Sequence, residues 1–221
     1  MSDVTITVRG ENETRITPER AAIHVSVRAD GPVRAAVVER AMALAEPVRG
    51  SITDREEAGS IADWSSKRLA VRAERPWNDQ GKQLAPVYYA SIDFTATFTE
   101  ASELSIWASE ISPWDGVDVG WVNWHLTPQT RADIEREVAS AAVGVAVQRA
   151  QAYAAALGLN SVTPVEIADT GLISRETTST PQMMKTRGAA FAASADAGPV
   201  MEYEPDDIVV SATVEARFTA R

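Results

Sequence analysis

Apolar and polar residues alternate along several segments of the chain, and this period of two predicts half-buried β-strands. Val4, Ile6 and Val8 alternate with polar residues, and a second alternating segment follows at 21–28. The polar residues 10–18 between them predict a turn, so we expect the first two strands to form a hairpin. The remaining predicted strands cover 64–73, 90–98, 120–126, 159–168 and 208–219.

Apolar residues at three- and four-residue spacing predict three helices. The first begins near residue 33 and is expected to end before an acidic loop at 50–59. The second is short and covers 104–111. The third is rich in alanine, covers roughly 130–157, and carries along one side Ile134, Val138, Ala141, Val145, Ala152 and Ala156.

Each predicted strand has one apolar and one polar face, which is typical of a sheet covered by helices on one side only. The sequence therefore predicts a two-layer α+β fold. Its mainly antiparallel sheet would carry helices packed on one face, including the long alanine-rich helix. We expect a single domain over residues 1–221. Because strand-helix-strand occurs twice, two intertwined halves (about 1–99 and 100–221) are an alternative description of it.

Composition and charge narrow the classes of partner and chemistry. The chain carries 21 basic and 31 acidic residues, a net charge of −10, so a nucleic-acid backbone or an anionic membrane would be repelled. No segment is long and apolar enough to predict membrane insertion. The absence of cysteine excludes disulfides, thiolate metal sites and cysteine nucleophiles. No secretion signal is visible after Met1, so a cytoplasmic location is expected.

Three groups of residues carry a family resemblance. They are the opening segments 6–10 and 18–23, the strand 89–96, and the helix with alanines at 142, 146, 150 and 154 that ends in Leu157-Gly158-Leu159. Together they resemble the SIMPL domain family, which includes bacterial periplasmic immunogenic and oxidative-stress-related proteins. The resemblance implies an α+β fold and, in some members, ring-like or channel-like assemblies. It implies no known catalytic activity, although bacterial members are commonly exported.

Aromatic and methionine residues outside the expected core are candidates for a contact surface. Several tryptophans lie at strand edges or in loops, where an amphipathic ring suits either a contact or the end of a core. The segment 170–205 is long for a loop and contains apolar residues, so it would form a lid over its own domain or an arm that reaches a second subunit. The candidate assembly residues are Trp64, Trp77, Trp114, Trp121, Met183, Met184, Phe191, Met201 and Tyr203.

Catalytic and metal-binding patterns are weak in this sequence. His24 and His125 lie on the polar faces of predicted strands, and Asp93 is the obvious third ligand for a metal. The simpler interpretation is that both histidines are hydrogen-bonded or solvated sheet residues. No serine lies in a G-x-S-x-G motif, and no glycine-rich segment predicts a phosphate cradle. We therefore predict no catalytic residues, no metal and no cofactor.

Three functional hypotheses follow from these observations. The favoured one is a self-associating, non-catalytic SIMPL-like domain with a structural, scaffold or stress-related role, which forms a homo-oligomer and contacts a protein partner that the sequence does not identify. The alternative is a small-molecule binding module with its pocket between the sheet and the 170–205 loop. A hydrolase or metal enzyme that uses His24 or His125 is a third hypothesis.

Overall fold

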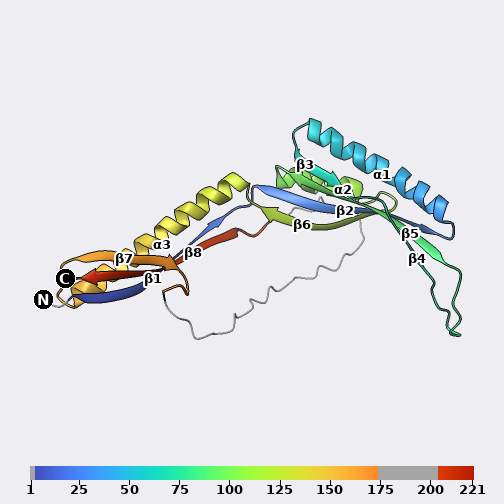
Figure 1. Ribbon diagram of the computed structural model, residues 1–221. Helices are drawn as coiled ribbons and strands as arrows, with labels where there is room; N and C mark the ends of the chain where they lie inside the picture. The colour runs from blue at the N-terminus through green and yellow to red at the C-terminus, as the bar shows by residue number, and fades with distance from the viewer. Residues whose placement is uncertain (1–2, 174–203) are drawn as a thin grey trace. The chain divides into compact units, whose positions relative to one another are not determined.

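The structure is a computed structural model and describes residues 3–173 and 204–221. Its helices and strands follow one another in the order β1 (Val4–Ile16), β2 (Arg20–Gly31), α1 (Arg34–Glu57), β3 (Ile61–Ser66), β4 (Ala70–Glu74), β5 (Val87–Phe98), α2 (Ala101–Ile111), β6 (Val117–His125), α3 (Pro128–Ala156), β7 (Val162–Asp169) and β8 (Ile208–Ala220). The predicted α+β class is confirmed, as are the antiparallel pairing and the long alanine-rich helix. The strands form two sheets (Figure 1).

The described residues divide into two compact units, each with its own sheet. Unit 1 contains residues 3–16, 128–173 and 207–221, and unit 2 contains residues 17–127 and 204–206. Unit 1 therefore draws its strands from both ends of the sequence, whereas unit 2 is nearly continuous. Whether the chain behaves as one domain stays a prediction.

Unit 1 is a three-stranded antiparallel sheet, in the order β1-β8-β7, covered on one face by α3 (Figure 1). Ile6 and Val8 of β1 and Phe218 of β8 pack against the helix, because alternate residues of a strand point to the same face. The buried residues that the helix contributes to this core are all alanines: Ala142, Ala146, Ala150 and Ala154.

Gly10 permits a close approach of α3 to β1. A Cβ atom at this position would lie 2.0 Å from the carbonyl oxygen of Ala142 and 2.8 Å from the backbone nitrogen of Ala146. Both atoms belong to the helix backbone, so the clash could not be relieved by rotating a side chain. The glycine of β1 and the alanines of α3 thus act together to bring helix and sheet into direct contact.

Unit 2 is a five-stranded antiparallel sheet in which β5 and β2 are central. The order is β3-β5-β2-β6, and β4 pairs with β5 next to β3. Helices α1 and α2 cover one face, and their apolar residues meet those of β2 and β5 in a large core, while Val37 and Ala41 of α1 form a second, small cluster with Ala29 and Ala90. The largest side chain of the large core, Trp107, is fully buried, lies against Phe98 and donates from Nε1 to the Ser51 hydroxyl at 3.0 Å.

Several details of the predicted elements are wrong. The first two strands form no hairpin: β1 pairs with β8, and β2 pairs with β5 and β6. The polar residues after Gly10 continue β1 to Ile16, because β8 supplies a partner along its full length. The predicted loop at 50–59 is helical as far as Glu57, with Ile52 buried.

Two further elements differ from their prediction. The strand expected at 64–73 is two short strands, β3 and β4, separated by residues 67–69. In α3 the predicted stripe through Ala141 and Val145 is wrong. The buried face runs instead through the alanines at 142, 146, 150 and 154, which are the positions that carried the family resemblance.

Candidate functional site

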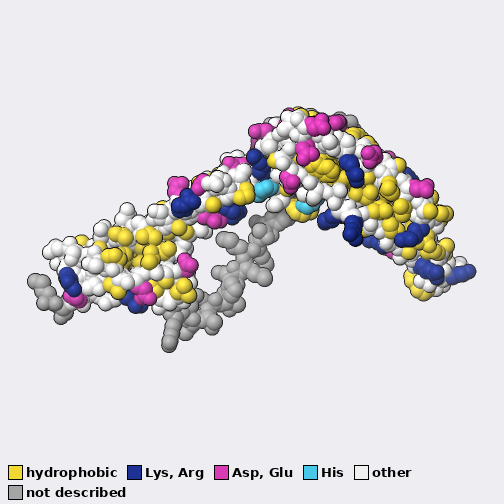
Figure 2. Space-filling model, turned by 45° about the horizontal axis from the view of Figure 1, so that its top comes forward, with side chains coloured by type: hydrophobic (Ala, Val, Ile, Leu, Met, Phe, Trp, Pro, Cys, Tyr) yellow, Lys and Arg dark blue, Asp and Glu magenta, His cyan; other side chains and the backbone are white. Residues whose placement is uncertain are grey.

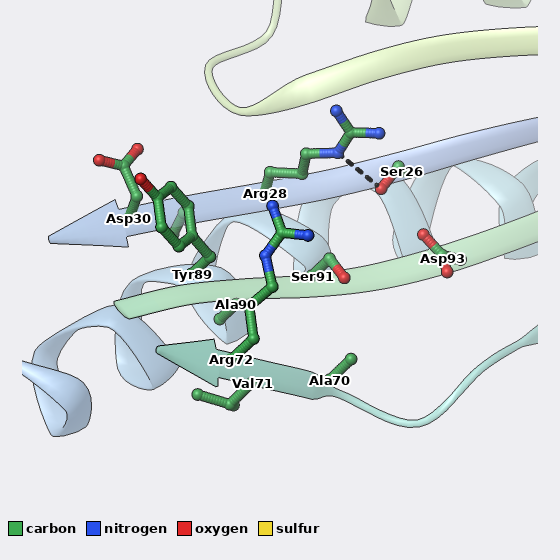
Figure 3. A pocket seen from close by; sticks show the side chains of 11 residues that line it. Ser26, Arg28, Asp30, Ala70, Val71, Arg72, Tyr89, Ala90, Ser91 and Asp93 are labelled. Carbon is green, nitrogen blue, oxygen red and sulfur yellow. Dashed lines mark hydrogen bonds between the residues drawn. The ribbon is translucent and has the colours of Figure 1, made fainter. Parts of the chain in front are cut away.

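The open face of the unit 2 sheet contains a hollow of about 740 Å³. This face lies opposite α1 and α2, so its side chains are the polar half of each alternating strand. The hollow lies over β2, β5 and β4 (Figure 3). Its polar and charged lining consists of Ser26, Arg28, Asp30, Arg72, Tyr89, Ser91 and Asp93.

The strand register explains how the hollow forms. Ser91 of β5 lies directly opposite Arg28 of β2 on one side and Ala70 of β4 on the other. Two residues before Ser91 on β5, Tyr89 lies between Asp30 of β2 and Arg72 of β4. Short side chains thus lie in the middle of the face, with long ones around them.

The two arginines of the hollow are held by weak, exposed contacts. Arg28 donates to the Ser26 hydroxyl at 3.2 Å and pairs with Asp118 at 3.0 Å. Arg72 pairs with Glu74 at 3.3 Å, and its guanidinium carbon lies 5.1 Å from the centre of the Tyr89 ring. Exposed ion pairs of this kind contribute little to stability, about 0–1 kcal/mol. Both guanidinium groups therefore remain accessible to an incoming anion.

His24 and Trp121 form an aromatic pair on the same open face. Their ring centres are 3.9 Å apart, and His24 Nδ1 lies 3.0 Å from the Thr95 hydroxyl oxygen. A bulge in β6 next to Gly120 places Trp121 beside β2. Trp121 remains 64% exposed, so one face of its ring is free to contact another molecule.

The two histidines do not form a joint site. Their strands are neighbours, but His125 pairs in register with Arg20, four residues before His24. Four residues of a strand span about 13 Å, which is too far for two side chains to share one metal. Asp93 lies opposite Ser26 rather than His24. Across residues 3–173 and 204–221, no cluster of three His, Cys, Asp or Glu side chains is arranged to hold a metal.

The predicted contact tryptophans lie in different surroundings. Trp64 and Trp114 pack partly against the unit 2 core, and Trp64 Nε1 also donates to Glu56 at 2.7 Å. Trp77 is 67% exposed in the β4–β5 connection, where it bridges to Gln83. The structure does not bring these three together with Trp121 into one patch. Met183, Met184, Phe191, Met201 and Tyr203 lie outside the described residues, as does most of the predicted lid or arm.

Unit 1 has an apolar groove that the sequence patterns did not single out. It has a volume of about 500 Å³ and lies between the start of β1 and the end of α3. Val4 and Ile6 form one wall; Tyr153 and Leu157, which are 55% and 62% exposed, form the other. Figure 2 shows apolar side chains gathered on the surface of this unit. The missed signal was the end of α3, where Tyr153 and Leu157 recur at four-residue spacing.

The groove adjoins an open sheet edge. β1 is an outer strand of its sheet, and no strand in the described part of the chain pairs with its outer side. The 13 residues of this edge form an unusually long template for another strand. None of the described helices is long and apolar enough to cross a membrane.

The chain belongs to the SIMPL family. The family model SIMPL, described as "Protein of unknown function (DUF541)", matches residues 6–218, which is nearly the whole sequence. The resemblance predicted from the β1 glycine, the β5 strand and the alanine-spaced helix is confirmed. A search of curated proteins found no match.

Proposed function

We propose that this protein is a self-associating SIMPL domain with a structural, scaffold or stress-related role and no catalysis of its own. The observation that carries the proposal is the apolar groove of unit 1 beside the open edge of β1. Exposed apolar surface next to an open strand edge favours pairing with another chain. The partner that fits is a second copy, because an edge strand can pair with itself around a twofold axis.

The alternating pattern of β1 restricts the register of such a pair. An antiparallel pairing centred on Ile6 would place Val4 opposite the Val8 of the second copy, on the face that carries α3. Thr5 would lie opposite the Thr7 of that copy, on the other face. This register joins the apolar faces of both copies and brings the two grooves together. A shift by one residue would place apolar side chains opposite polar or charged ones.

The native mass in solution tests the proposal. Light scattering on a sizing column should give a multiple of the monomer mass of 23.8 kDa at micromolar concentration. The double variant Tyr153→Glu with Leu157→Glu should shift the protein to the monomer, because it places two charges in the groove. Both side chains are exposed, so the fold should tolerate them.

Met42→Glu is the matched control. Met42 is 57% exposed on α1 of unit 2, whereas the groove belongs to unit 1. This variant should keep the wild-type mass. A wild-type protein that stays at 23.8 kDa at all concentrations would contradict self-association. A double variant that keeps the wild-type mass would contradict the groove as its site.

The register is tested by cross-linking. Because the chain has no cysteine, the variant Thr5→Cys with Thr7→Cys carries the only two thiols. In the proposed pair the thiol at position 5 of each copy would face the thiol at position 7 of the other, and mild oxidation should give a covalent dimer. The control is the variant Glu11→Cys with Glu13→Cys. In this register neither of its thiols lies opposite a thiol of the second copy, so it should not form the covalent dimer.

A small-molecule binding module is the second candidate, favoured by the hollow on the open face of unit 2. The two functions are separable, because assembly depends on unit 1 residues and the hollow on unit 2 residues. The pocket predicted between the sheet and the 170–205 loop stays a prediction, because 174–203 are outside the described residues.

A further inference from the structure

The hollow of unit 2 has a floor of short side chains and a rim of charged ones. Ser91, Ala70 and Ser26 leave space over the middle of the sheet, while Arg28 and Arg72 rise from the strands on either side of β5 (Figure 3). The volume of about 740 Å³ is in the range of small-molecule sites. A ligand lying over Ser91 would meet charges of both signs.

Arg28 and Arg72 form the cationic end. Guanidinium groups stay charged and carry several donors in a fixed plane, which suits a carboxylate. Their present partners, Asp118 and Glu74, are more than half exposed, so a ligand that satisfies both arginines at once can compete with them. The Ser91 hydroxyl, opposite Arg28 in the register, adds a donor from the floor.

Asp93 forms the anionic end. Its side chain is half-buried and lines the hollow, and its carboxylate has no hydrogen bond or ion pair to any residue that the structure describes. It lies two residues beyond Ser91 on the same face of β5, which corresponds to about 6.6 Å along the strand. A half-buried carboxylate favours a cationic or hydrogen-bond-donating partner. For the same reason it would repel an anion that carries no donor group.

We propose that this hollow binds a small zwitterion of dipeptide length. The carboxylate of the ligand lies between Arg28 and Arg72 over Ser91, and its ammonium group lies on Asp93. About five bonds separate the amino nitrogen and carboxyl carbon of a dipeptide, and an extended chain of that length spans about 6 Å. A single amino acid is too short to reach both ends. The proposal does not depend on self-association.

Glycylglycine is the simplest probe, because it has both charged ends and no side chain. Equilibrium dialysis of the full chain against labelled glycylglycine at millimolar concentration should show one saturable site. N-acetylglycylglycine lacks the ammonium group and glycylglycine amide lacks the carboxylate. Each should bind at least about tenfold more weakly, which is the size expected for losing one charged hydrogen bond. Inorganic phosphate should not displace the dipeptide.

Variants locate the site. Arg72→Gln and Asp93→Asn should each weaken glycylglycine binding by at least about tenfold. Asp93→Asn should not weaken the binding of N-acetylglycylglycine any further, since that probe has no ammonium group for Asp93 to bind. Arg34→Gln is the matched control, because this exposed arginine lies on α1 outside the hollow. Circular dichroism would confirm that each variant is folded.

Three outcomes would overturn the proposal. One is the absence of saturable glycylglycine binding. Another is equal binding of glycylglycine and its acetylated form, which would mean that the ammonium group is not recognised. The third is a loss of binding in Asp30→Asn but not in Asp93→Asn, which would place the ammonium group at the other carboxylate of the hollow.

Discussion

At Gly10 the missing side chain sets how closely α3 lies on β1. We expect Gly10→Ala to lower the free energy of unfolding of unit 1 by at least about 2 kcal/mol, because its methyl group would overlap the backbone of α3. Urea unfolding followed by circular dichroism measures this change.

The control is Gly144→Ala. Gly144 lies within α3, and a Cβ atom there would meet nothing within 4 Å. This variant should be neutral or more stable by up to about 1 kcal/mol, since alanine favours a helix over glycine. Equal effects of the two substitutions would contradict the close-contact role of Gly10.

At the scale of the element, α3 packs through a face of alanines. Replacing the fully buried Ala150 with leucine should destabilise unit 1 by about 1–3 kcal/mol, because the added atoms have no space between helix and sheet. Ala155→Leu places the same side chain on the exposed face of α3 and should change stability by less than about 0.5 kcal/mol. Thermal unfolding of both variants gives the comparison; a similar loss in each would show that helix propensity, not packing, is responsible.

The element scale also shows what sequence patterns can and cannot predict. Alternation predicted β5 and β8 well, because each has a continuous buried face. It did not identify the partner of β1, since a period of two describes the faces of a strand and not its neighbours. The third helix has small residues on several faces, so its apolar periodicity could not distinguish Ala141 from Ala142.

The candidate site was less predictable than the strands, because an alternating pattern does not show which strands are neighbours or in what register they pair. Asp93 was singled out on the polar face of its strand, but as a metal ligand beside the histidines. Its position near Arg28 and Arg72 depends on the register of three strands, two of which are far apart in sequence. The contact of His24 with Trp121 depends on a bulge in β6, which no alternating pattern shows.

At the scale of the whole molecule, unit 2 is nearly continuous in sequence and has its own buried core. We expect a chain of residues 17–127 to fold alone, with a cooperative urea transition and Trp107 protected from solvent. Its near-ultraviolet circular dichroism and Trp fluorescence report this. A non-cooperative transition would instead support a single domain over residues 1–221. Deleting residues 17–127 would not test in the same way whether unit 1 folds alone, because unit 1 is made of three separate segments of the chain.

The pairing of Val4 with Ala220 has a consequence for how the protein is made. β8 is the central strand of unit 1, so during synthesis β1 has no partner until Ile208–Ala220 leaves the ribosome. The continuous part of unit 2 is complete about 80 residues earlier, and domains generally fold as they emerge. The nascent chain should therefore carry a folded unit 2 behind an unpaired, alternating β1 strand. During that interval the unpaired β1 strand is the segment that a chaperone would protect. Neighbouring chains translated from the same messenger RNA would also be most able to pair through their β1 edges.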